Sequence, residues 1–123
     1  MLRAEPVGGG CIAHATHLVT ERGDYFLKYG DGDVAQTFVA EAAGLRALRD
    51  AASPLAVPDV LAAEAEHANR PGYLLMEWIA SGPKGAGFWD AFGEGLAALH
   101  RHTAELYGFE GDNYIGRLPQ QNP

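Results

Sequence analysis

Three features near the N-terminus could together bind a phosphorylated ligand: a glycine run, a lysine and a glutamate. The run Gly8–Gly10 opens the stretch GGGCIAHATHLVTERGDYFLKYG, directly before two strand-like segments. Glycine has no Cβ, so such a loop lets backbone N–H groups approach a phosphate closely. Lys28, in the second segment, could supply a cation for the same phosphate. Taken singly, a glycine run is also typical of a plain loop, and a strand lysine of a solvent-facing side chain.

The third residue, Glu41, lies within an apolar helical pattern. Asp33 followed three residues later by Gln36 resembles a capping box, which predicts a helix over residues 34–51. The apolar positions that share one face of this helix are Phe38, Ala42, Leu45 and Leu48. Glu41 falls on the same face, and burying an unpaired carboxylate is costly unless it reaches solvent at the edge of the face. Glu41 therefore needs a cation from another element, and Lys28 is the nearest candidate by topology.

Two hairpins are expected to frame this helix. Segments 15–20 and 24–29 flank a polar turn that contains Gly23, which predicts an antiparallel pair with Lys28 on its second strand. Segments 60–66 and 73–79 predict a second hairpin with a longer loop, and the second of these strands is the more apolar. We therefore expect strand 73–79 to lie inside the sheet.

A stretch of small residues, ASGPKGAG, follows at positions 80–87 and is typical of a connector between two structural units. Beyond it, apolar residues at helical spacing predict an amphipathic helix over 88–103. The tail from 104 to 123 shows no periodicity and no evident partner. We expect two parts, residues 1–79 and 80–123, divided at this connector.

Composition excludes several classes of function. The chain has 123 residues, which suffice for one modest core, and a formal charge of −7, which repels nucleic acids and anionic membrane surfaces. Cys11 is the single cysteine, and the five histidines are scattered, so neither a disulfide nor a metal site is expected. No apolar run approaches a membrane span or a signal peptide, which favours a cytoplasmic location.

The order of these features, glycines, strand, strand with lysine, helix with glutamate, hairpin, connector and helix, is that of a protein-kinase-like N-terminal lobe. The local sequence motifs are more specific to one family than the order of these features is. It resembles the fructosamine kinase (ketosamine 3-kinase) family over nearly its whole length. The stretches that carry the resemblance are GGGCI, YFLKYG, FVAEAAGLRAL, VPDVL, YLLMEWI, GEGLAALHRHTAELYGFEGDNYIG and PQQNP.

This resemblance implies an α+β fold: an ATP-binding lobe of an antiparallel sheet plus one helix, then a hinge and the first helix of a truncated C-terminal lobe. It also implies phosphorylation of the 3-hydroxyl of glycation-derived ketoamines with ATP and Mg²⁺, a deglycation or protein-repair activity. Lys28 becomes the nucleotide lysine, Glu41 its helix partner, and Met76 the back of the adenine pocket. The implied phosphate loop consists of Gly8, Gly9, Gly10, Cys11 and Ile12, and the implied hinge of Glu77, Trp78 and Ile79.

The resemblance also shows what the sequence lacks. The HGDLW-like segment with the family's catalytic aspartate, and the later aspartate that holds Mg²⁺, do not occur in these residues. The chain alone is therefore expected to lack catalytic and metal-binding residues and to be inactive, with an exposed apolar helix that favours self-association. Two alternatives stay open: another small-molecule phosphotransferase of the same superfold, such as an aminoglycoside or choline-type kinase, and a non-catalytic nucleotide-binding module.

Overall fold

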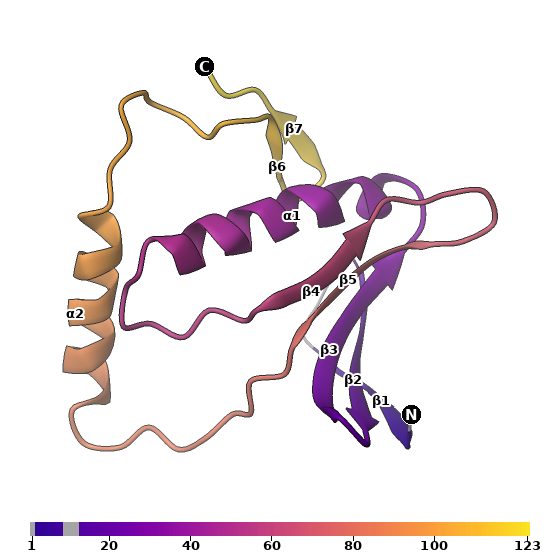
Figure 1. The fold of residues 1–123 in the computed structure, drawn as a ribbon, viewed down its shortest axis with the longest axis horizontal. Helices are drawn as coiled ribbons and strands as arrows, with labels where there is room; N and C mark the ends of the chain where they lie inside the picture. Colours follow the sequence, from indigo (N-terminus) through magenta and orange to yellow (C-terminus); the bar gives the residue numbers. More distant parts are fainter. Residues whose placement is uncertain (1, 9–12) are drawn as a thin grey trace.

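A computed structural model describes residues 2–8 and 13–123, which form a five-stranded sheet, two helices and a small separate hairpin (Figure 1). The strands are β1 (Arg3–Pro6), β2 (His14–Thr20), β3 (Gly23–Gly30), β4 (Val60–Glu64), β5 (Gly72–Glu77), β6 (Asn113–Ile115) and β7 (Leu118–Gln120). The helices are α1 (Asp33–Asp50) and α2 (Phe88–His100). The predicted antiparallel sheet with one helix is confirmed.

The sheet has the strand order β1-β2-β3-β5-β4, and every neighbouring pair is antiparallel. Strand β5 lies between β3 and β4, so the expectation of an interior position for this apolar strand is confirmed. Strand β1 was not foreseen from the sequence, because all four of its residues are exposed and carry no alternating pattern. Its pairing with β2 makes these two strands neighbours, and Gly8 follows the end of β1 by two residues.

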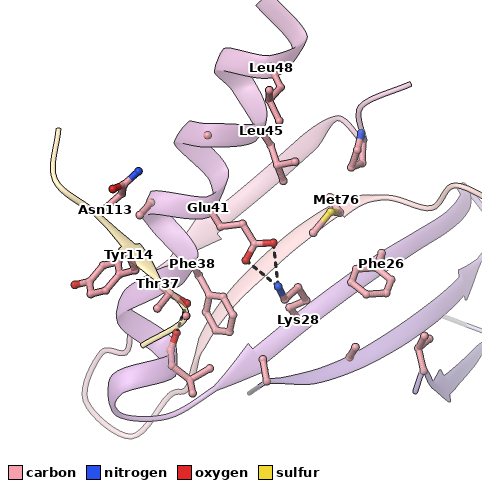
Figure 2. A pocket seen from close by; sticks show the side chains of 18 of the residues that line it. Phe26, Lys28, Thr37, Phe38, Glu41, Leu45, Leu48, Met76, Asn113 and Tyr114 are labelled. Carbon is pink, nitrogen blue, oxygen red and sulfur yellow. Dashed lines mark hydrogen bonds and ion pairs between the residues drawn. The ribbon is translucent and has the colours of Figure 1, made fainter. Parts of the chain in front are cut away.

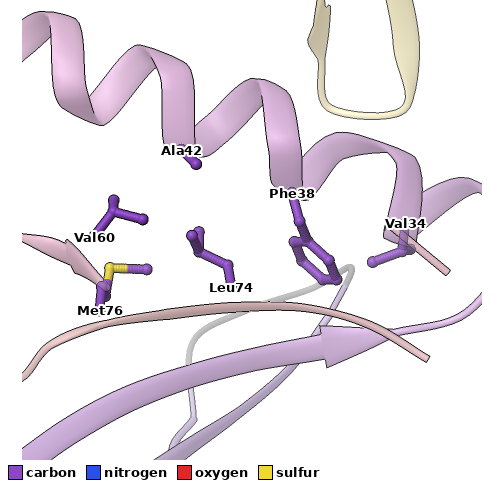
Figure 3. Packing of buried hydrophobic residues seen from close by; sticks show 6 residues of the cluster. All are labelled: Val34, Phe38, Ala42, Val60, Leu74 and Met76. Carbon is purple, nitrogen blue, oxygen red and sulfur yellow. The ribbon is translucent and has the colours of Figure 1, made fainter. Parts of the chain in front are cut away.

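Helix α1 covers the β4 and β5 half of one face of the sheet, and the core forms beneath it (Figures 1 and 3). The buried cluster consists of Val34, Phe38, Ala42, Val60, Leu74 and Met76. Gly72 permits this close approach, since a Cβ built at Gly72 would lie 2.7 Å from the Cβ of Ala35. Helix α1 packs less extensively on the other half of this face, over β1 to β3, which leaves room for a site beside the helix.

Helix α1 begins differently from the capping box predicted at Asp33 and Gln36. Gly32 precedes the helix with φ of 61° and ψ of −131°, and no side chain caps its N-terminus. The Gly32 amide instead donates a hydrogen bond of 3.0 Å to Oε2 of Glu66, in the loop between β4 and β5. The capping-box prediction is wrong because glycine accepts the positive φ, and a residue distant in sequence satisfies the amide.

The C-terminal part also differs in detail from the expectation. Helix α2 ends at His100, three residues before the predicted end, and it stands apart from the sheet, near the loop that follows α1 (Figure 1). The tail, expected to have no partner, forms the β6–β7 hairpin and lies beside α1. Within the described residues, no helix has both the length and the apolar character needed to cross a bilayer.

Candidate functional site

Lys28 and Glu41 form the ion pair predicted from the sequence. Lys28 Nζ donates to both carboxylate oxygens of Glu41, at 2.9 Å to Oε1 and 2.8 Å to Oε2 (Figure 2). The side chains are 27% and 35% exposed, respectively. Because both groups are partly withdrawn from water, the pair holds its geometry better than a surface ion pair does.

The strand register and the helix face bring these two side chains together. Lys28 on β3 lies opposite Ala15 on β2 and Leu74 on β5, so its side chain rises on the same side as the buried core. Glu41 lies one turn beyond Phe38, which is 1% exposed and anchors α1 to the sheet. The core therefore fixes the distance from α1 to β3, and the ion pair spans that distance.

The pair lies in an open cleft of about 950 Å³ between α1 and strands β2, β3 and β5 (Figure 2). That volume is at the upper end of what small-molecule sites use. Phe26, Ala15 and Met76 supply an apolar surface, and Lys28 supplies a cation beside it. An apolar shelf next to a positioned cation suits a ligand that has a flat ring at one end and an anion at the other.

The glycine run contributes one described residue to this cleft. Gly8 lines it and has no atom within 4 Å of where a Cβ would be. Gly9, Gly10, Cys11 and Ile12 lie outside the described residues. The phosphate-loop prediction for these four residues therefore stays a prediction.

The predicted adenine-side residues divide between two cavities. Met76 is 6% exposed and lines the cleft beside Phe26. Glu77, Trp78 and Ile79 line a second cavity of about 480 Å³ that reaches the end of α1. The Glu77 amide donates to the carbonyl of Asp59 at 2.8 Å, and the Asp59 amide donates to Oε2 of Glu77 at 3.1 Å. Because the Glu77 amide is already engaged, a backbone N–H that donates to an adenine ring would have to come from a residue after Glu77.

The hairpin β6–β7 adds residues to the cleft that sequence reasoning missed. Asn113, Tyr114 and Gly116 line its α1 side, beside Thr37 (Figure 2). The only signal was GDNYIG, one of the stretches that carry the resemblance, from which no chemical role could be read. Their contribution depends on long-range packing against α1.

The described residues hold no cluster of three or more His, Cys, Asp or Glu side chains that could bind a metal ion. Glu41, the carboxylate nearest the cleft's cation, has both oxygens engaged by Lys28.

An antiparallel five-stranded sheet, a helix packed on it and a lysine–glutamate pair between them define the N-terminal lobe of a protein-kinase-like fold. A crystal structure from Haemophilus somnus 129PT, of a protein named "Putative fructosamine-3-kinase", matches this chain with a TM-score of 0.83. The match has 24% identity and covers 98% of this chain and 40% of that one. It supports the fold.

The particular family is shown by sequence. The sequence model of the fructosamine kinase family matches residues 1–123, and the chain therefore belongs to that family. Proteins that carry the name "Probable ketoamine kinase" are 37% identical in Synechocystis and 39% identical in Enterococcus faecium, over 95% of this chain. A chloroplastic protein-ribulosamine 3-kinase of Arabidopsis thaliana is 36% identical over 94% of it. The chain spans 39%, 39% and 35% of these relatives' lengths, respectively.

Proposed function

We propose that this chain is the ATP-binding part of a kinase that phosphorylates ketoamines, the sugar adducts formed by glycation. In the proposed reaction the 3-hydroxyl oxygen of the ketoamine forms a bond to the γ-phosphorus of ATP. The bond from that phosphorus to the β,γ-bridging oxygen breaks, and ADP leaves. The hydroxyl proton passes to a base that these residues do not supply.

The observation that carries the proposal is the Lys28–Glu41 ion pair at the edge of the cleft. Lys28 would hold the α- and β-phosphates, and Glu41 would keep its ammonium group aimed at them. Phe26, Ala15 and Met76 would contact the adenine ring, and Trp78 and Ile79, which line the neighbouring second cavity, would form the hinge. The acceptor class comes from the ketoamine and ribulosamine names of the relatives.

Mg²⁺ would be held by residues beyond the 123 of this chain. Among the described residues, the carboxylates form no group of three or more that could hold the ion. When bound with ATP, the metal would neutralise the charge that develops on the transferred phosphoryl group. The part played by this chain is to bind, orient and partly desolvate the nucleotide.

The test begins with titration calorimetry of ATP into the purified chain, with Lys84→Met as the matched control for Lys28→Met. Lys84 is the chain's only other lysine and lies over the rings of Phe88 and Trp89 rather than in the cleft. We expect ATP affinity to fall in Lys28→Met and to stay unchanged in Lys84→Met. Equal affinities in all three proteins would contradict the proposed site.

The acceptor is tested in the full-length protein that this proposal implies. Fructoselysine, ribuloselysine, kanamycin and choline are offered at equal concentration, and ADP release is followed. Turnover of the ketoamines alone supports the proposal. Preferred turnover of kanamycin or choline would assign the chain to another phosphotransferase of the same superfold.

A further inference from the structure

The geometry points to His17 as the positioning residue of the hinge, an inference that rests on the proposed function. The imidazole of His17 on β2 stacks on the indole of Trp78, with ring centroids 3.8 Å apart and planes 4° from parallel. Trp78 is the first residue after β5, and its ring also stacks on Phe26 at 6.0 Å. A β2 side chain thus holds the start of the segment that would contact adenine.

The strand register explains why His17 can reach Trp78. His17 lies opposite Phe26, and Phe26 lies opposite Met76, so the three side chains form one row on the cleft side of the sheet. Trp78 follows Met76 by two residues and therefore projects to the same side. The indole lies back over the row, toward β2.

The imidazole itself is hydrogen-bonded to one carboxylate and lies near a second. Nε2 donates to Oδ2 of Asp24 at 2.8 Å, and Nδ1 lies 3.8 Å from Oε2 of Glu5 on β1. Because an ionised carboxylate can only accept, Nε2 carries the proton in the Asp24 contact. The His17 side chain is 15% exposed, so the stack is largely shielded from water.

Few other contacts order the hinge backbone. In residues 2–8 and 13–123, neither the Trp78 nor the Ile79 amide donates a backbone hydrogen bond outside the sheet. Ile79 is 47% exposed. The stacks on His17 and Phe26 therefore hold Trp78 against the sheet, and removing the closer one, on His17, should let the first hinge residues open locally.

The test measures amide hydrogen exchange at residues 77–80 and acrylamide quenching of Trp78 fluorescence in the 123-residue chain. Trp89→Phe leaves Trp78 as the only tryptophan, and Trp89 is 67% exposed, so the change is well tolerated. The variants are His17→Ala and His17→Phe, which keeps a ring for stacking. His14→Ala is the control, since His14 stacks on Tyr29 on the opposite face of the sheet.

We expect His17→Ala to speed exchange at residues 77–80 by about two- to tenfold and to raise quenching, as loss of one aromatic contact implies. His17→Phe should restore most of the protection, and His14→Ala should leave it unchanged. Unchanged hinge exchange in His17→Ala, equal acceleration in β4, or no rescue by phenylalanine would overturn the inference.

ATP affinity separates this inference from the proposed function. If His17 positions the hinge, ATP affinity should fall in His17→Ala and recover in His17→Phe. The variant with the faster hydrogen exchange at residues 77–80 should be the one with the weaker ATP binding. If exchange responds as expected but the unsubstituted chain does not bind ATP, the proposed function fails and the hinge assignment stands. Lowered affinity without a change in exchange would overturn the positioning role.

Discussion

The Lys28–Glu41 pair makes the sharpest prediction, because Lys28 contacts both carboxylate oxygens of Glu41 directly. In the full-length protein implied by the proposed function, Lys28→Met removes the cation that would hold the phosphates. Glu41→Gln leaves the lysine in place but reduces the side chain from two acceptor oxygens to one. Since Nζ donates to both oxygens, at 2.9 and 2.8 Å, the glutamine keeps at most one of these contacts.

The magnitudes follow from that difference. Removing one positioned group that stabilises transition-state charge costs roughly 10²–10³ in turnover, which we expect for Lys28→Met. A hydrogen bond to a charged group contributes about 1.5–3 kcal/mol, and the partial exposure of both side chains reduces this to about 1–1.5 kcal/mol. Glu41→Gln should therefore lower turnover by about tenfold.

The double variant distinguishes a functional unit from two independent residues. If Glu41 acts by aiming Lys28, turnover of Lys28→Met/Glu41→Gln should match that of Lys28→Met alone, a coupling of about 1–1.5 kcal/mol. Steady-state ADP release measures turnover, with Lys84→Met as control and urea unfolding as a check on stability. Multiplying losses, or full activity in Glu41→Gln, would refute the reasoning and leave Glu41 as an ordinary helix carboxylate.

Three further predictions concern the chain by itself. The purified 123-residue chain should not transfer phosphate from ATP to fructoselysine, because the segments expected to supply the base and the metal ligands do not occur in its sequence; labelled phosphate on the sugar would contradict this. The chain should self-associate through α2, where Trp89 is 67% and Phe92 43% exposed, and Trp89→Glu should shift sedimentation toward monomer; a monomer at high concentration that binds no hydrophobic dye would count against it. Gly72→Ala should lower the free energy of unfolding by about 1–3 kcal/mol in urea melts, because its Cβ would meet that of Ala35, whereas Gly44→Ala in open space should be neutral or stabilising.

Periodicity and local turn chemistry were enough to predict the main elements. The apolar face of α1, the Gly23 turn and the apolar run of β5 each act over a few residues, so their signals survive in the sequence. The ion pair could be predicted for a related reason. A carboxylate on an apolar helix face requires a cation, and Lys28 was the candidate that topology offered.

Short pairings and contacts between distant residues could not be predicted in this way. Strand β1 has four exposed residues and β6 three residues, too few for a period to show, and each is a strand only because a partner pairs with it. The amide of Gly32 is satisfied by Glu66, thirty-four residues away, where the sequence suggested a local cap.

The same division applies within the site. The sequence by itself determined the lobe, the family and the lysine–glutamate pair, because those depend on residue type and local spacing. Only the tertiary structure decided that Tyr114 reaches the cleft beside α1 and that His17 stacks on Trp78. The position of Tyr114 depends on packing of the β6–β7 hairpin against α1, which no local pattern encodes. For His17 the physical reason is register: a one-residue shift of β2 would turn its side chain to the other face of the sheet, and register is fixed by packing across the whole sheet.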